Sequence, residues 1–235
     1  MGKLWSFTQN FIRSQGRPGV SFVNILKEKF PNNSFVNLGK PGETVKSLYS
    51  RLIKTGLDAD FDVSFLWIGT NDVYSKLLKV QAQPVAENHD EFIKLYEQVL
   101  KIVMPSTKKV VTVSPSIVGE HIENQTNKEI KELSVLIQSL SEKELIDYMN
   151  LQTIFEKELA NRNSSTYIST NPFRVMFDVF FYKSEARIDR LSNERGLKLT
   201  LDGIHLNSTG ARIVADEYAT VIRSTLVDSS IMEVS

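Results

Sequence analysis

The 235-residue sequence contains no cysteine, which excludes disulfides and thiolate metal sites. Neither sign of charge is in excess, since 28 Lys and Arg balance 28 Asp and Glu. Because phosphate backbones are bound by clustered cations, this balance argues against nucleic acid as the main partner. No stretch approaches the roughly 18–20 consecutive apolar residues of a membrane span. With 41% hydrophobic and 24% charged residues, the composition matches an average globular domain.

The chain also lacks the features that divide a protein into parts or direct its export. No Pro/Gly/Ser-rich linker, low-complexity tract or internal repeat interrupts it, so we interpret residues 1–235 as one domain. Residues 1–19 are expected to be irregular, and residues 228–235 to form a frayed tail. The N-terminus has no signal-peptide pattern, which predicts a cytoplasmic protein unless a start further upstream adds an export signal. The sequence does not specify an oligomeric state.

Short apolar runs alternate with helical patterns along the chain, which is typical of parallel βαβ units. The run at 61–68 is almost continuously apolar, as expected for a strand buried on both faces. Ligands of open α/β sheets bind outside the carboxyl ends of the strands, so we expect functional residues in the turns that follow them. The pattern predicts strands at 34–38, 61–68, 109–113 and 145–149, and helices at 20–30, 43–55, 91–103, 127–140 and 209–226.

The first such turn, NLGKPGET at 37–44, contains two glycines and leads into a predicted helix. Its backbone N–H groups would lie at the positive end of that helix, where they could hold an anion. An ordinary strand-to-helix turn is the alternative. The segment is not a P-loop, because the Gly-Lys-Ser/Thr ending is absent.

The second turn, GTND at 69–72, follows the apolar run at 61–68. Asn71 offers a short side-chain amide that could stabilise charge developing on an oxygen atom. Alternatively, Asn71 and Asp72 only hydrogen-bond their own backbone.

The third turn, DGIHLN at 202–207, precedes the last predicted helix, which Asn207 or Ser208 could cap. Asp202 beside His205 could fix the tautomer of the imidazole and leave the other ring nitrogen as a general base. A capping or packing histidine is the alternative.

The chain has two other histidines. His89 lies in a polar segment and is interpreted as a solvated surface residue. His121 follows the predicted strand at 109–113, so it is the second candidate for a base or a substrate contact.

Taken in order, the three turns resemble the blocks of the SGNH (GDSL-type) hydrolases, from about Val20 onward. This resemblance implies an α/β fold, a three-layer α/β/α sandwich with a mostly parallel, flavodoxin-like sheet. It also implies an esterase or lipase that hydrolyses a small-molecule ester through an acyl-enzyme, with no metal or organic cofactor. By the family pattern, Gly42 and Asn71 would form the oxyanion hole, His205 would be the general base and Asp202 its orienting acid. Asp72 has no role in this pattern.

One block of the family pattern is missing. A hydrophobic strand ending in Gly-Asp-Ser-Leu should precede Val20, but the best match is MGKLWS at 1–6, with Lys3 and Leu4 in place of Asp and Ser. We therefore interpret residues 1–19 as a remnant of this block and allow for a sheet without its first strand. The nucleophile is not identifiable. Ser6 is a candidate, but none of Ser6, Ser14 and Ser21 lies in a strand-to-helix elbow that would expose and activate its hydroxyl.

Three explanations for the missing block stay open. The true start can lie upstream, so that the block is absent from this sequence; we favour this explanation because the other motif residues are all present. The protein can instead be a non-catalytic binding protein that recognises a glycan or acyl ligand on the same scaffold. Finally, Ser6 or another hydroxyl can replace the serine.

An apolar stretch at 173–182 shows helical spacing, with Phe173, Met176, Phe177 and Phe180 on one stripe. We interpret it as a core-facing helix. A wall of the acyl pocket and a self-association surface are the alternatives.

Overall fold

The structure, a computed structural model, describes residues 3–8, 21–57, 60–78, 83–160, 165–171 and 184–232. Five parallel strands form one sheet in the order β2-β1-β3-β4-β5. The strands are β1 (Lys3–Thr8), β2 (Ser34–Asn37), β3 (Phe61–Trp67), β4 (Thr107–Val113) and β5 (Asp147–Met149). The helices are α1 (Phe22–Lys29), α2 (Val45–Thr55), α3 (Thr70–Tyr74), α4 (His89–Val103), α5 (Gln125–Lys143), α6 (Leu151–Leu159), α8 (Glu185–Glu194) and α9 (Ser208–Met232).

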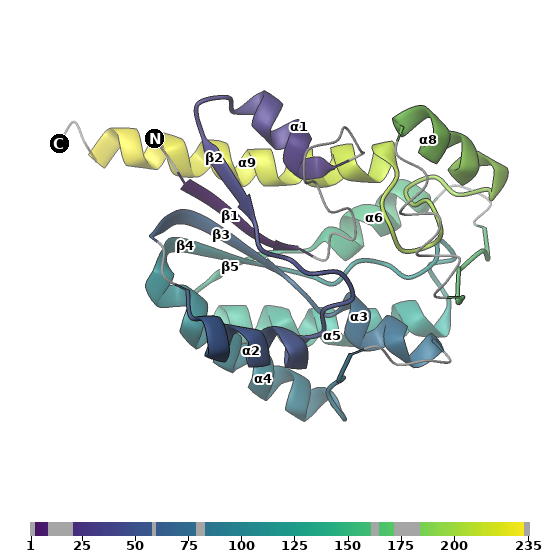
Figure 1. Ribbon diagram of the computed structural model, residues 1–235, viewed down its shortest axis with the longest axis horizontal. Helices are drawn as coiled ribbons and strands as arrows, with labels where there is room; N and C mark the ends of the chain where they lie inside the picture. The colour runs from purple at the N-terminus through teal and green to yellow at the C-terminus, as the bar shows by residue number, and fades with distance from the viewer. Residues whose placement is uncertain are drawn as a thin grey trace.

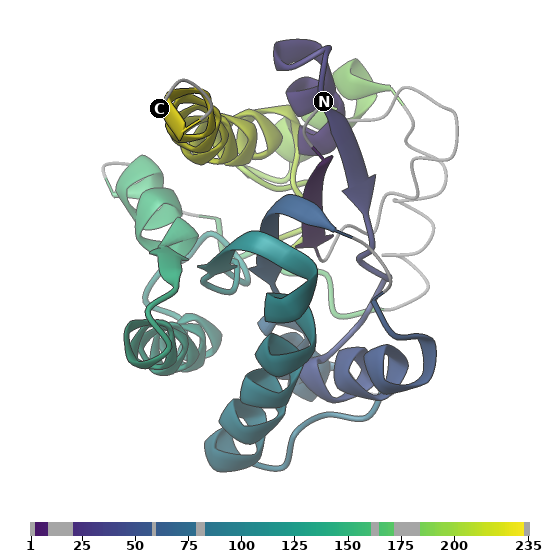
Figure 2. The same cartoon turned by 90° about the vertical axis from the view of Figure 1, so that its left-hand side faces the viewer.

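The helices cover both faces of the sheet, which gives three layers (Figure 1). One buried cluster joins the sheet to α1, α6, α8 and α9, and a second joins it to α2, α3, α4 and α5. Figure 2 shows the sheet between these layers from the side. The predicted α/β sandwich with a parallel, flavodoxin-like sheet is confirmed, and its strand order reverses between β1 and β3.

Alternation of side chains explains why β3 reads as one continuous apolar run. Val63, Phe65 and Trp67 belong to the cluster beneath α1 and α9, whereas Leu66 and Ile68 belong to the opposite cluster. A strand with helices on both faces has no solvent-facing side, so apolar residues occupy both sets of alternating positions, with Asp62 and Ser64 as the polar residues of one set. The prediction of a strand buried on both faces is confirmed.

The N-terminal segment corrects the sequence interpretation. Residues Lys3–Thr8 are not irregular: they form β1, which pairs with β2 on one side and β3 on the other. A sheet without this strand would leave backbone N–H and C=O groups of β2 and β3 unpaired, at about 1–3 kcal/mol for each buried group. Aromatic residues favour strands, but the polar residues between them hid the pattern in so short a segment.

Further differences concern the helices. The chain is helical to Met232, so residues 228–232 are not a frayed tail. His89 begins α4 instead of lying in a loop. Helices α3, α6 and α8 were not predicted. The apolar stretch at 173–182 lies outside the described residues, and within them no helix is long and apolar enough to cross a membrane.

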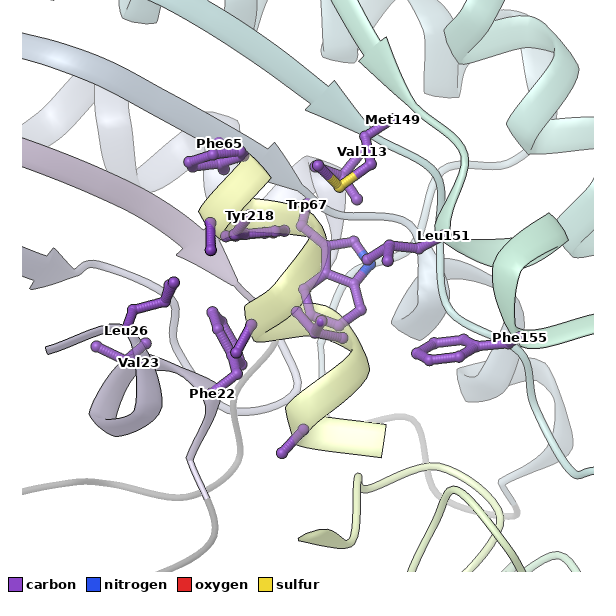
Figure 3. Packing of buried hydrophobic residues seen from close by; sticks show 14 of the residues in the cluster. Phe22, Val23, Leu26, Phe65, Trp67, Val113, Met149, Leu151, Phe155 and Tyr218 are labelled. Atoms are coloured by element: carbon purple, nitrogen blue, oxygen red, sulfur yellow. The ribbon is translucent and has the colours of Figure 1, made fainter. Parts of the chain in front are cut away.

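Aromatic packing fixes the carboxyl-terminal half of β3 against the helices of one face (Figure 3). The ring of Tyr218 in α9 stacks on Phe65 with centroids 3.9 Å apart and an interplanar angle of 11°. Phe22 of α1 meets Tyr218 edge-on at 5.3 Å and Trp67 at 6.0 Å. Because stacked and edge-to-face aromatic pairs stabilise beyond the area they bury, these contacts help to hold the end of β3, from which the turn at 69–72 departs.

Phe65 tests this packing. Phe65→Ala is expected to lower the free energy of unfolding by about 3–5 kcal/mol, because it leaves a cavity beneath Tyr218. Urea unfolding measures the change. The control is Ile53→Ala, at a side chain that is 59% exposed, which should change stability by no more than about 0.5 kcal/mol. Equal effects of the two substitutions would contradict the packing described here.

Candidate active site

The turn after β3 requires glycine at its first position. Gly69 has φ +121°, and a side chain there would place its Cβ 2.8 Å from Cγ of Pro115. The chain then enters α3, which carries Asn71 with its side chain buried. The amide Nδ2 of Asn71 donates to the carbonyl of Glu43 at 3.1 Å. Two of the predicted turns, at 37–44 and 69–72, therefore lie in contact.

Hydrogen bonds and an ion pair fix the residues that follow Gly42. Gly42 has φ +71°, a conformation that favours glycine. Two residues later, Thr44 caps α2: its hydroxyl accepts the amide of Ser47, and the hydroxyl of Ser47 accepts the amide of Thr44. The carboxylate of Glu43 receives two bonds of 2.7 Å from the guanidinium of Arg51.

The sequence predicted that the N-terminus of α2 could hold an anion. The structure shows which anion lies there. The carboxylate of Asp72 accepts the backbone N–H of Val45, the first residue of α2, with N–O distances of 3.0 and 3.3 Å. The alternative that Asp72 bonds only its own local backbone does not hold, because Val45 lies 27 residues away in the sequence.

The third turn brings its carboxylate and imidazole together. Oδ2 of Asp202 lies 2.7 Å from Nδ1 of His205, and both side chains are buried. The other carboxylate oxygen accepts the backbone N–H groups of His205 at 2.9 Å and Ile204 at 3.1 Å. This arrangement fixes the ring orientation, so Nε2 is the nitrogen that can take a proton from a substrate or nucleophile.

Burial and partner charges act in opposite directions on Asp202. Burial raises the pKa of a carboxyl group, but the charge of His205 and the hydrogen bonds from His205 and Ile204 hold the pKa of Asp202 below its ordinary value. The ionised form of Asp202, which accepts the N–H of the imidazole, is therefore favoured.

Glu120 supports the loop that carries this pair, and the sequence analysis missed it. Its buried carboxylate accepts the backbone N–H groups of Lys198 at 2.6 Å and of Leu199 and Thr200 at 2.8 Å. It also accepts the hydroxyl of Thr200 at 2.8 Å. The position of Glu120 just after β4, beside a histidine that had been singled out, was the available signal. Its partners, about 80 residues away, could not be identified from the sequence.

Backbone contacts hold the third turn against its neighbours. The N–H of Gly119 donates to the carbonyl of Gly203 at 2.6 Å. Gly203 itself has φ +92°, and a Cβ there would lie 2.9 Å from the carbonyl oxygen of Tyr167. A side chain at residue 203 would thus be both strained and obstructed.

Tyr74 connects α3 to the loop of Asp202. Its hydroxyl donates to the carbonyl of Ser169, whose N–H donates to the carbonyl of Asp202 at 2.9 Å. Burial, together with the nearby charge of Asp202, raises the pKa of Tyr74, so its hydroxyl stays a donor. Ile204 belongs to the same buried cluster as Val73 and Tyr74. The helix of Asn71 and the loop of His205 therefore lie on one side of the molecule, beyond the carboxyl ends of the strands.

The other sequence candidates lie as follows. His121 is half-buried, and its Nδ1 has no hydrogen-bond partner among the described residues. His89 lies near Glu132, with 3.9 Å between Nε2 and a carboxylate oxygen. Ser21 precedes α1 as its N-cap residue. Within the described ranges, no three His, Asp or Glu side chains gather to hold a metal ion.

Glu120 provides the test of how this site is held. Glu120→Gln is expected to destabilise the protein by about 2 kcal/mol, because the NH2 that replaces one carboxylate oxygen would face a buried N–H donor that then has no acceptor. Thermal and urea unfolding measure the loss. Glu123→Gln, at an exposed position three residues away, should leave stability unchanged. A Glu120→Gln variant as stable as the Glu123→Gln control would contradict the proposed support.

Comparison with known structures gives the same fold. The acetyl xylan esterase AlAXEase is 23% identical, with a TM-score of 0.67 and coverage of 94% of this chain and 99% of its own. Axe2, an acetylxylan esterase from Geobacillus stearothermophilus, is 16% identical with a TM-score of 0.63 and 92% coverage of both chains. A member of the lipolytic protein G-D-S-L family from Veillonella parvula DSM 2008 is 15% identical, with a TM-score of 0.62 and coverage of 94% and 98%.

No curated protein matches the sequence. The family model described as GDSL-like Lipase/Acylhydrolase matches residues 6–218, which include β1 from Ser6 and all three turns of the site. The chain therefore belongs to the GDSL-like lipase/acylhydrolase family, as the order of its motifs predicted.

Proposed function

We propose that the protein is a carboxylic ester hydrolase that acts through an acyl-enzyme. The observation that carries this proposal is the 2.7 Å contact between Asp202 and His205, on a loop connected through Tyr74 to the helix of Asn71. A buried carboxylate that orients an imidazole is the arrangement that activates a hydroxyl nucleophile. The family match supports the same chemistry.

In the proposed reaction, Nε2 of His205 takes the proton of a hydroxyl group whose oxygen attacks the ester carbonyl carbon. Negative charge develops on the carbonyl oxygen, where the backbone N–H of Gly42 and the side-chain amide of Asn71 stabilise it. The tetrahedral intermediate expels the alcohol, which receives the proton from His205. Water then attacks the acyl-enzyme in the same way and releases the acid. Throughout, Asp202 holds the ring and stabilises the imidazolium.

The position of β1 in the sheet bears on the nucleophile. By strand register, Ser6 lies opposite Phe65, and Thr8, the last residue of β1, lies opposite Trp67. Ser6 is therefore two residues inside the sheet, whereas the turn with Asn71 begins beyond its carboxyl end. This register disfavours Ser6 as the attacking group. It also keeps one alternative in view, a binding protein for a glycan or acyl ligand that lacks a nucleophile.

We propose a small acyl group on a sugar hydroxyl as the substrate. The support is that two of the similar structures are described as acetyl xylan esterases. An acetyl ester of an oligosaccharide and a short-chain aryl ester are therefore the first substrates to examine.

The acid–base pair gives the main test of activity. His205→Ala is expected to reduce kcat/KM for an aryl acetate by about 10³-fold or more, and Asp202→Asn by a comparable factor because the ring loses its preferred tautomer. His89→Ala, at an exposed histidine outside the site, should retain wild-type activity. Turnover by the wild type that survives His205→Ala would contradict the assigned base.

Covalent labelling tests the acyl-enzyme directly. A fluorophosphonate probe is expected to form one adduct on a hydroxyl residue of the wild type, and mass spectrometry of the digest identifies that residue. Labelling should be lost in His205→Ala, because the hydroxyl is no longer activated. The wild type would refute the hydrolase proposal if it showed neither an adduct nor turnover. Binding of the acetylated oligosaccharide under those conditions, measured by calorimetry, would establish the non-catalytic alternative.

A further inference from the structure

Asp72 is the charged residue of the turn at 69–72, and the proposed reaction gives it no role. Its side chain is 3% exposed, and it directly follows Asn71 in α3. Both residues reach across to the same short segment at the start of α2. Asn71 donates to the carbonyl of Glu43 at 3.1 Å, and Asp72 accepts the N–H of Val45 at 3.0 Å.

We propose that Asp72 is a positioning residue, whose bond to Val45, together with the bond from Asn71 to Glu43, holds Gly42 in register with Asn71. The two bonds have opposite direction and grip the segment on either side of Thr44. Gly42 is the next residue before this gripped segment, so its backbone N–H cannot shift independently of α3. The two donors thus keep a fixed spacing before any substrate binds, as electrostatic stabilisation of an oxyanion requires. This inference rests on the proposed function for its catalytic consequence, but the clamp itself does not.

A carboxylate at position 72 does not serve stability, because burying its charge is costly. Burial raises its pKa from an ordinary 3.8 to about 7, although the N–H of Val45, its own N–H and the charge of Lys76 act in the other direction. An asparagine of the same shape could also accept from Val45, without the cost of a buried charge. What the ionised side chain adds is a charge-assisted bond at the positive end of α2, which is stronger than a neutral one.

The charges on the neighbouring elements do not neutralise Asp72 directly. Lys76, which follows α3, lowers its pKa but is itself bonded to another carboxylate. Its partner is Glu129 of α5, at 2.7 Å. Two charged side chains of α2 are paired at the same distance, Lys46 with Glu91 of α4 and Arg51 with Glu43.

A pH dependence of stability follows from the raised pKa. Between about pH 4 and pH 7 the folded protein keeps a proton on Asp72 that the unfolded chain releases. Stability contributed by this group is therefore present below pH 4 and is lost as pH rises to about 7. Above pH 7 the carboxylate is ionised in both states and the contribution is constant. The clamp is strongest in this upper range, where the protein is less stable.

The decisive experiment compares wild type with Asp72→Asn by ¹H–¹⁵N NMR from pH 5 to pH 8.5. In the wild type, the amide resonances of Val45 and Gly42 and the side-chain amide of Asn71 should titrate together near pH 7. In Asp72→Asn they should be shifted and should not titrate. Asp147→Asn, which removes an exposed carboxylate at β5, should behave as wild type. Unchanged Gly42 and Asn71 resonances in Asp72→Asn would overturn the proposal.

Urea unfolding over the same pH range gives a second readout. The unfolding equilibrium constant of wild type relative to Asp72→Asn should rise by up to about tenfold per pH unit between pH 5 and pH 7 and then level off. If the unfolding equilibrium constants of wild type and Asp72→Asn changed with pH in the same way, Asp72 would not be a buried carboxyl group with a raised pKa. If Asp72→Asn does not fold, the titration of the wild-type resonances decides alone.

Ester hydrolysis separates the catalytic consequence from the clamp. Asp72→Asn is expected to lower kcat on the order of tenfold or more with KM within about twofold, because misplaced donors act on the transition state. An unchanged kcat in an active enzyme would overturn the positioning role. A wild type that hydrolyses no ester but shows the coupled titration would refute the proposed function and leave the clamp established.

Discussion

The short contact between Asp202 and His205 is the interaction on which the site depends, and the chain alone does not enforce it. The two residues are three positions apart, across a glycine with a positive φ, and such a turn has many open conformations in an isolated peptide. The fold selects the closed one. The two N–H groups of Ile204 and His205 bond the carboxylate from within the turn, while Gly119 and Ser169 hold its backbone carbonyls from outside.

The same kind of contact recurs around this pair: a buried side chain of one segment hydrogen-bonds the main chain of another. Glu120 serves the segment at 198–200, Asp72 serves the first residue of α2, and Tyr74 serves the carbonyl of Ser169. Main-chain groups in loops cannot pair along a sheet ladder, so each requires a partner of its own when buried. These bonds tie the segment at 198–200, the start of α2 and the segment of Ser169 to the parts of the chain that carry the three side chains. In the proposed reaction, preorganisation of this kind would allow the oxyanion donors and the base to act without reorganising.

The sequence predicted the periodic parts of the fold and the local parts of the site. The run at 61–68 and the helix around Ile130 carry enough repeats for their period to be seen, and Asp202 and His205 lie close enough for a turn to join them. The strand at Lys3–Thr8 was missed because its position between β2 and β3, and not its own composition, makes it a strand. Glu120 was missed, and Asp72 was assigned no role, for a related reason. Their partners lie about 80 and 27 residues away, and a single sequence carries no record of such contacts.

Two buried carboxylates in this region have pKa values moved in opposite directions, and the difference follows from their partners. Asp202 and Asp72 are almost equally inaccessible to water, so burial raises the pKa of both. For Asp202, the imidazole of His205 and two N–H donors outweigh this effect of burial. Asp72 has the N–H of Val45, while the ammonium of Lys76 is held by Glu129. Environments that separate the protonation of neighbouring acids are what acid–base chemistry needs. The charged form of Asp202 is thereby favoured beside His205, whereas Asp72 holds a proton more readily than an ordinary carboxyl group.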